Sequence, residues 1–436
     1  MPKYSPNSMI LLLNAHKKIF PEKLNLYCFS ENRKSSETSY VQIRLASYPG
    51  PNCAFEFFIA SCPTVSNPDY FGLTSPKTDI YVELNYDLPV RENYPVLMCY
   101  PPMVYESRWQ QIIFAIEIYK YYGTDMQIQY INSAMTEIVD LLEIYEKKGF
   151  IKIEKFAFVD FDDKTVSKIG INPMLELNSR NQPLALTDCL MKYRESAEFI
   201  IIADVDDILF PQRKPFYNEF SFWSKVYSNF SAFMYYRSYA KIEVAETFEE
   251  FSFEKTIKSL KKIDVLDFGK TVYKTKNVEA AWIHWPPFKN RTTATVPPNK
   301  GRMLHVQVKN STLYMTNLHK MRAFNPIPDN DIQELTKNFT SSFKGYPSFK
   351  ANGIYAKSIF NCYQASVDWD ITHPNEKAPC VNPLQCEKPK YVKNYKCKVA
   401  RRDFFATPIN NNIVFHVASS NYYWWTSGNG CNVFSN

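Results

Sequence analysis

Glycine is scarce in this sequence, with 11 residues among 436. None of the glycines forms a GxGxxG, GxxxxGKS or GxxxxGKT motif, the turns that hold the phosphates of dinucleotides and nucleoside triphosphates. The HExxH motif of zinc peptidases and the GxSxG motif of α/β-hydrolases are absent as well. A phosphate-bearing ligand would therefore need a different kind of site.

Long apolar runs are missing too. The longest, residues 9–13 and 199–203, are far shorter than the roughly 20 residues of a membrane-spanning helix, so no membrane-spanning segment is expected. The N-terminal stretch MPKYSPNSMILLLNAHKK does not match a secretory signal, because its paired lysines follow the apolar residues. The net charge is +7, but no run of five basic residues occurs, so a nucleic-acid partner is not expected.

Cysteine, by contrast, is well represented, with ten residues that lie mostly toward the two ends of the chain. Cys380, Cys386 and Cys397 form no CxxC pair, which argues against a zinc site. An even number of cysteines fits disulfide bonds formed in an oxidising lumen, although reduced thiols in a cytosolic protein stay an alternative. We expect pairing within the two terminal clusters and free thiols at Cys99 and Cys189, which fall on predicted core elements.

The chain divides into regions of different pattern. Short apolar bursts between residues 24 and 90 predict antiparallel strands. From residue 94 on, strand-like and helix-like segments alternate, which is typical of an α/β fold with a parallel sheet. The predicted regions are a small β-rich domain over 1–93, a catalytic domain over 94–345, and an irregular, cysteine-containing C-terminal extension over 346–436.

Three carboxylates follow the predicted buried strand 199–203. Asp204, Asp206 and Asp207 would lie at the carboxyl end of this strand, where open α/β sheets bind their ligands. In extended backbone, Asp204 and Asp206 point to the same side, about 7 Å apart. Such carboxylates suit Mg²⁺ or Mn²⁺, and the ion could hold a diphosphate without a glycine loop.

Two alternatives for this motif stay open at this stage. In the first, one aspartate caps the helix or turn that follows and the others are solvated. Haloacid-dehalogenase-type phosphatases also follow an apolar strand with DxD, a β-branched residue and Leu, which Ile208 and Leu209 imitate. Those enzymes begin their domain with this strand, however, whereas several elements of the α/β unit precede it here.

The residues around the motif resemble glycosyltransferase family 92. The matching pieces occur in order over residues 94–322: a strand ending in CYPP, a helix led by Trp109 with the pair Ile116–Glu117 and a stop at Gly123, then DCL before the strand with DxD. The resemblance implies an α/β fold of GT-A type with a mixed, mainly parallel sheet behind the small β-rich domain. It further implies inverting transfer of a hexose, with galactose the favoured sugar, from a UDP-sugar to a glycan acceptor.

The resemblance also implies roles for individual residues. Asp204 and Asp206 match the DxD that binds Mn²⁺ or Mg²⁺, with His284 as third ligand. Asp207 stands where the family usually has Glu, and it would share in donor binding. His319 and Arg322 match a later segment of the family.

An inverting transfer needs a base that deprotonates the acceptor hydroxyl. Glu246 is our candidate, with Glu249 as the alternative. Family members are usually Golgi membrane proteins with an N-terminal anchor, so a Golgi location is expected although no anchor is visible. A catalytically silent, lectin-like protein of the same fold is the non-enzymatic alternative.

Overall fold

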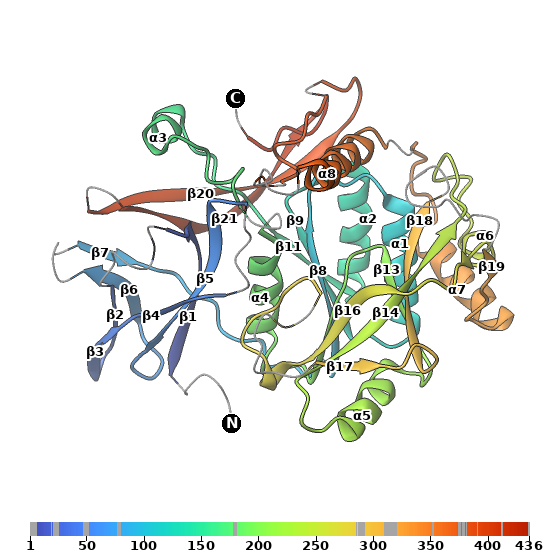
Figure 1. Cartoon of the computed structure of the whole chain (residues 1–436), viewed down its shortest axis with the longest axis horizontal. Coiled ribbons are helices and arrows are strands. Elements are labelled where there is room, and N and C mark those ends of the chain that lie inside the picture. Colours follow the sequence, from blue (N-terminus) through green and yellow to red (C-terminus); the bar gives the residue numbers. More distant parts are fainter. Residues whose placement is uncertain are drawn as a thin grey trace.

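The computed structural model describes most of the chain. The described residues exclude 1–6, 19, 21–25, 47–51, 76–79, 178–180, 285, 287–292, 309–320, 351–352, 374–375, 377–379, 381, 390, 411–412 and 435–436. Figure 1 shows the N-terminal strands on one side of a central sheet and the C-terminal strands above both. None of the described helices combines the length and apolar character needed to cross a bilayer.

The N-terminal region consists of antiparallel strands in two small sheets. The first sheet has the order β1-β5-β4 and the second β3-β2-β6-β7. Their apolar faces enclose a core that includes Phe58, Phe71 and the disulfide Cys28–Cys62. The strands are β1 Ser8–His16, β2 Tyr27–Asn32, β3 Ser35–Tyr40, β4 Gln42–Leu45, β5 Phe55–Pro63, β6 Tyr70–Ser75 and β7 Ile80–Glu83.

The central sheet has 11 strands and begins with a parallel block, β11-β9-β8-β12. Antiparallel strands then enter beside β12, so the sheet is mixed. The predicted α/β fold with a mixed, mainly parallel sheet behind a β-rich region is confirmed. The strands are β8 Val96–Met103, β9 Met126–Ile131, β11 Ile151–Lys155, β12 Phe199–Ile202, β13 Asp207–Pro211, β14 Ala232–Ile242, β15 Lys261–Lys262, β16 Asp267–Lys274, β17 Thr293–Val296, β18 Gly301–Val308 and β19 Arg322–Ala323.

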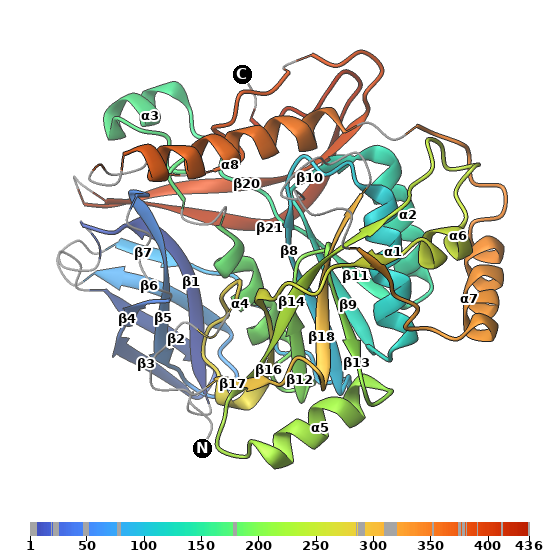
Figure 2. The same ribbon diagram turned by 45° about the vertical axis from the view of Figure 1, so that its right-hand side comes forward.

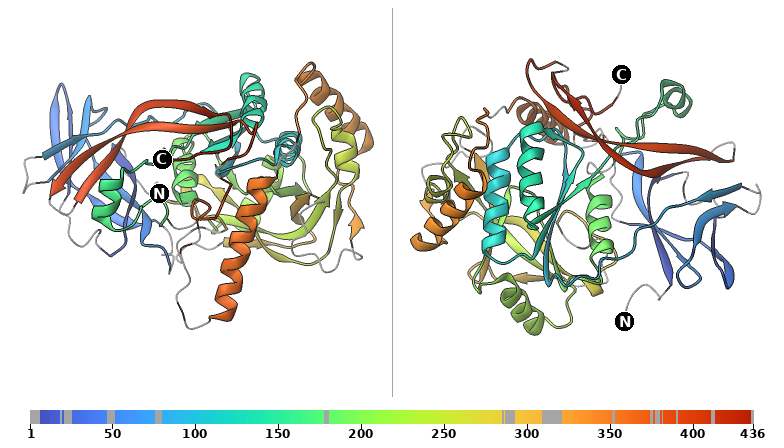
Figure 3. Two further views of the ribbon diagram at one scale, coloured as in Figure 1. Left: turned by 90° about the horizontal axis from the view of Figure 1, so that it is seen from above. Right: turned by 180° about the vertical axis from the view of Figure 1, so that it is seen from behind.

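Helices cover both faces of the parallel block (Figures 1 and 3). Alternate residues of β8 explain this: Met98 and Tyr100 pack in the core with α1 and α2, whereas Leu97 and Cys99 pack with α4. Both faces of the strand are thus buried, as its unbroken apolar run requires. The helices are α1 Trp109–Tyr121, α2 Thr136–Lys147, α3 Asp163–Ile169, α4 Gln182–Lys192, α5 Phe216–Val226, α6 Phe253–Lys258 and α7 Asp329–Ser342.

The C-terminal extension is not irregular, contrary to the prediction. It contains helix α8 (Ile354–Thr372) and a long antiparallel hairpin of β20 (Cys397–Asn410) and β21 (Ile413–Ser427). β20 also pairs with β10 (Ser133–Met135), which belongs to the catalytic region. The hairpin escaped prediction because many of its side chains on both faces stay partly exposed, so no clear apolar alternation marks it.

All ten cysteines are paired. Three disulfides lie within a terminal cluster: Cys28–Cys62, Cys362–Cys386 and Cys397–Cys431. The prediction of free thiols at Cys99 and Cys189 is wrong, because these residues face each other from β8 and α4 and form a disulfide. Pairing is also not confined to the terminal clusters, since Cys53–Cys380 links one to the other.

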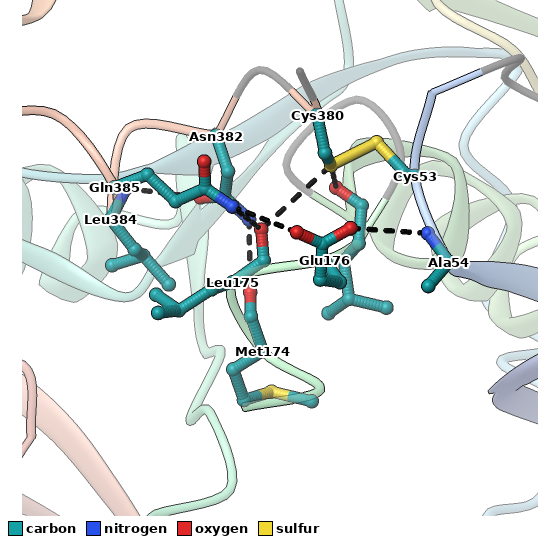
Figure 4. The surroundings of a disulfide bond; sticks show 10 residues. Cys53, Ala54, Met174, Leu175, Glu176, Cys380, Asn382, Leu384 and Gln385 are labelled. Carbon is teal, nitrogen blue, oxygen red and sulfur yellow. Dashed lines mark hydrogen bonds between the residues drawn. A yellow bond between two sulfur atoms is a disulfide. The ribbon is translucent and has the colours of Figure 1, made fainter. Parts of the chain in front are cut away.

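The segment around Glu176 supports the Cys53–Cys380 disulfide (Figure 4). The Ala54 amide donates a hydrogen bond to one carboxylate oxygen of Glu176, at 3.2 Å, and the Gln385 side-chain amide donates to the other, at 3.3 Å. The Gln385 amide also donates to the Leu175 carbonyl at 2.8 Å. Residues from the two ends of the chain therefore meet on this segment of the catalytic region.

Candidate active site

The acidic motif forms a turn at the end of a buried strand. Strand β12 ends at Ile202, and the Asp207 amide donates to the Asp204 carbonyl at 2.9 Å. The chain then leaves as β13, antiparallel to β18, with Asp207 opposite His305. The expectation of extended backbone from Asp204 to Asp206 is wrong, because this hydrogen bond closes a tight turn there.

Helix α1 and strand β18 hold this turn in place. The Tyr119 hydroxyl donates to the Asp207 carbonyl at 2.8 Å and accepts from the Leu209 amide at 3.2 Å. Complete burial raises the pKa of Tyr119 well above its ordinary value, so this side chain stays a neutral donor. On the other side, the Val306 amide donates to the Asp206 carbonyl at 2.6 Å. The turn is thus fixed from both neighbouring elements.

Basic side chains from distant parts of the chain offset the repulsion among the aspartates. The Lys270 ammonium, on β16, lies 2.7 Å from an oxygen of Asp204 and 3.6 Å from Asp207. The side chain of Lys270 is only 3% exposed and that of Asp207 is fully buried. Burial alone would raise the pKa of Asp207, but His305 and Lys270 lower it below its ordinary value. The site therefore carries its own compensating cations.

Arg108 provides a further cation, immediately before α1. Its guanidinium donates to Asp206 at 2.9 Å and to both oxygens of Glu106, at 2.9 and 2.7 Å. Glu106 is buried, yet Arg108 lowers the pKa of this carboxyl below its ordinary value despite the opposing effect of burial. A two-point contact fixes the guanidinium plane, so Glu106 orients Arg108 toward the acidic turn.

The turn and β18 together offer a group of metal-binding atoms. Ligand atoms of Asp206, Asp207 and His305 lie within 4.8 Å of one another. Among the described residues, the second carboxylate oxygen of Asp207 is buried without a hydrogen-bond partner. Two carboxylates and an imidazole suit Mn²⁺ or Mg²⁺. In the described part of the chain, the Asp207 oxygen has only the Lys270 ammonium near it, at 3.6 Å, so it could still coordinate a cation. These residues therefore fit a divalent ion.

Of the predicted metal ligands Asp204, Asp206 and His284, this group contains Asp206. Asp204 instead contacts Lys270. His284 lies near the cluster, since Asp204 and Asp207 influence its protonation, and its Nδ1 is 3.1 Å from the Gly269 carbonyl oxygen. Burial and Lys270 lower the pKa of His284, so a neutral imidazole is favoured. Its metal-binding role stays a prediction.

The candidate bases lie on the loop that follows β14. Glu246 and Glu249 are both exposed. The loop is anchored to α1, because Gln110 exchanges hydrogen bonds of 2.7 Å with the amide and the carbonyl of Ala245. Glu246 follows Ala245 directly, and Gln110 lies two positions after Arg108 in the sequence. The catalytic role of Glu246 stays a prediction. Arg322 is exposed on β19, and His319 lies outside the described residues.

Sequence reasoning missed Arg108, Lys270 and His305. Lys270 and His305 come from strands that are 60 to 100 residues away from the motif, so their proximity depends on sheet pairing. The stretch ESRW carried one local signal, because an acidic residue two positions before an arginine at a helix start can form the observed pair.

Comparison with known proteins gives a consistent result. A family model described as glycosyltransferase family 92 matches residues 94–343. "Glycosyltransferase family 92 protein F13G3.3" of Caenorhabditis elegans is 22% identical over 448 residues, covering 98% of this chain and 87% of that protein. The family 92 protein F55C10.4 of the same organism is 25% identical over 456 residues, covering 96% and 86%. Among solved structures, S. aureus TarS 1-349 in complex with UDP-GlcNAc is 10% identical, with a TM-score of 0.28 over 65% of this chain and 74% of that chain.

Proposed function

Because the chain belongs to glycosyltransferase family 92, we propose that it transfers a hexose, namely galactose, from a UDP-sugar to a glycan acceptor, with inversion at the anomeric carbon. The observation that carries this proposal is the acidic turn 204–207 at the carboxyl end of β12, surrounded by Arg108, Lys270 and His305. A phosphatase of the haloacid-dehalogenase type would begin its domain with the DxD strand. Here β8, β9 and β11 of the same sheet come before that strand in the sequence.

Asp206, Asp207 and His305 would hold the divalent ion, Mn²⁺ or Mg²⁺. When bound, such an ion supplies positive charge that stabilises the departing diphosphate. Lys270 and Arg108 add two positive charges of the protein itself beside the same carboxylates. We assign Arg108, whose side chain is 33% exposed, to the oxygens of the donor diphosphate, because charge-assisted hydrogen bonds from a preorganised cation are strong. Lys270, which is 3% exposed, compensates the aspartates.

Glu246 is our candidate for the base that removes the proton of the acceptor hydroxyl. Its exposed position on a loop anchored to the start of α1 leaves it accessible to an incoming acceptor. The proton moves to the carboxylate as the hydroxyl oxygen attacks the anomeric carbon, while the bond from that carbon to the diphosphate oxygen breaks and UDP leaves with the electron pair.

We further propose that the protein works in the Golgi lumen. Five disulfides support an oxidising compartment. Peptide mapping of the denatured, unreduced protein tests this: ten reactive thiols would contradict it.

A donor screen tests the activity. The purified chain is incubated with UDP-, GDP- and CMP-sugars and Mn²⁺, and nucleotide release is measured. We expect release from UDP-galactose in wild type and none in Asp207→Asn, while Asp264→Asn, on the exposed segment before β16, serves as the matched control that keeps activity. Activity confined to GDP- or CMP-sugars, or hydrolysis of simple phosphate esters instead, would refute the proposal.

A further inference from the structure

A cavity of about 2500 Å³ lies between the N-terminal sheets, helix α4 and the C-terminal hairpin. Figure 2 shows α4 between the N-terminal strands and the central sheet, with β21 passing across its upper end. Asp204, Asp206 and Asp207 are not among the described residues that line this cavity. The volume is more than twice the upper end of the roughly 300–1,000 Å³ typical of small-molecule pockets, so an extended ligand fits it better than a compact one.

The cavity reaches the carboxyl end of β11. Glu154 and Lys155, the last two residues of β11, line the cavity, and so do residues 156–159, which follow the strand. The carboxyl end of β11 lies at the same edge of the sheet as the carboxyl end of β12, because these strands are parallel. The cavity therefore reaches the edge of the sheet at which the acidic turn lies.

A cluster of paired charges lines the cavity. The Lys192 ammonium lies 2.9 Å from Asp188, 3.3 Å from Glu154 and 3.8 Å from Asp87. Across the cavity, on β20, the Arg402 guanidinium experiences the charges of Asp87 and Asp188. Around Lys192, three carboxylates face two cations, so this part of the cavity does not favour an anionic group such as the diphosphate of a nucleotide. Paired charges that line a cavity are instead good donors and acceptors for hydroxyl groups.

An aromatic ring completes the cluster. Tyr422 of β21 pairs across the hairpin with Arg402, whose guanidinium carbon lies 4.0 Å from the centre of the ring. Tyr422 lines the cavity and is 39% exposed, and Lys192 and Asp188 act electrostatically on its hydroxyl. An exposed flat ring beside hydrogen-bonding groups suits a ligand with apolar C–H faces and polar edges, and a pyranose sugar has both.

We infer that this cavity binds an oligosaccharide of neutral sugars, the acceptor glycan, through Tyr422, Arg402, Lys192, Asp188 and Glu154. The assignment of the glycan as acceptor rests on the proposed transferase function. The cavity holds the body of the glycan along α4, while the end that reacts extends to the edge of the sheet that carries the acidic turn.

The test measures binding of the full chain, without donor, to an array of neutral oligosaccharides built from hexoses and N-acetylhexosamines. We expect wild type to bind, and Tyr422→Ala to bind about tenfold more weakly, since an aromatic contact is lost. Tyr423→Ala is the matched control, because Tyr423 is equally aromatic and exposed, lies next along β21 and does not line the cavity. It should bind within about twofold of wild type. Tyr422→Leu keeps apolar bulk on the strand and replaces Tyr422→Ala if that variant does not fold.

Donor hydrolysis separates this inference from the proposed function. Release of UDP from UDP-galactose without acceptor should be unchanged in the Tyr422 variants, because the ring lies outside the acidic site. No binding by wild type to any glycan of the array, or equal losses in the Tyr422 and Tyr423 variants, would overturn the inference. Glycan binding that depends on Tyr422 in a protein without donor hydrolysis would support the site while refuting the transferase proposal.

Discussion

Replacing Lys270 by methionine removes the cation that lies deepest in the acidic site. The ammonium of Lys270 is 2.7 Å from Asp204 and 3.6 Å from Asp207, and its side chain is 3% exposed. Removing one partner of a buried ion pair costs about 3–5 kcal/mol, because the remaining charge is left uncompensated. Asp204 is 32% exposed and can regain water, so we expect a loss near the lower end, about 3 kcal/mol in the free energy of unfolding.

Lys274→Met is the matched control for this measurement. Lys274 lies on the same strand, and its ammonium donates to the carbonyls of Tyr227 and Ser228, at 3.2 and 3.3 Å, rather than to the aspartates. Losing such hydrogen bonds costs about 0.5–1.5 kcal/mol. Urea unfolding in the presence of a chelator compares the two variants with wild type. Equal losses in both variants would refute the idea that Lys270 compensates the acidic turn.

Adding Mn²⁺ extends the test to the metal site. In Lys270→Met the carboxylates lack their cation, so the ion should bind more tightly and stabilise this variant more than wild type. At 100 times its dissociation constant, a ligand that binds only the folded state adds about 2.7 kcal/mol. Mn²⁺ should therefore restore most of the loss in Lys270→Met and change Lys274→Met no more than wild type. A variant that stays equally unstable with and without Mn²⁺ would contradict the assignment of the cation site.

Three further predictions concern other parts of the chain. Asp206→Asn should abolish nucleotide release from UDP-galactose and, through the lost ion pair with Arg108, lower the free energy of unfolding by about 1–3 kcal/mol; full activity would refute its role. Burial raises the pKa of Glu117, so the stability that its protonated form contributes is lost as pH rises through that pKa. Glu117→Gln should thus gain stability relative to wild type as the pH rises above 4.5, the ordinary pKa of this carboxyl, in urea titrations at a series of pH values, and a constant difference would contradict this. Replacing Cys53 and Cys380 together by serine opens a link between residues 327 positions apart and should cost about 3–5 kcal/mol in non-reducing thermal unfolding, whereas an unchanged midpoint would show that the disulfide adds no stability.

The local sequence pattern was sufficient to locate β12 and the acidic turn that follows it. The apolar run 199–203 and the aspartates after it are neighbours in sequence, so the strand and the turn at its end could be found without knowing the sheet. The conformation of the turn was not predictable in the same way. It depends on Tyr119 and Val306, which bond to the backbone of Asp207 and Asp206 from elements far along the chain.

Partners of the acidic turn are set by strand register. His305 faces Asp207 because β18 pairs with β13, and a register change of one residue would turn the imidazole to the opposite face. Cysteine pairing shows the same limit. The sequence places Cys99 and Cys189 on core elements correctly, but their disulfide depends on which face of β8 packs against α4, and that is a property of the assembled sheet.

The pairing of β10 with β20 determines when the site can be completed during biosynthesis. Residues 133–135 of β10 pair with residues 397–399 of β20. The Glu106 amide donates to the Ser133 carbonyl at 3.1 Å, and the Glu106 carboxylate holds Arg108. The position of Arg108 therefore depends on a strand that begins within the last 40 residues of the chain. A ribosome must therefore finish nearly the entire polypeptide before the strand beneath Glu106 gains its neighbour. The segment 94–343 that matches the family model lacks β20, so expression of that segment alone should yield a protein with an open strand edge at β10, prone to association with other chains.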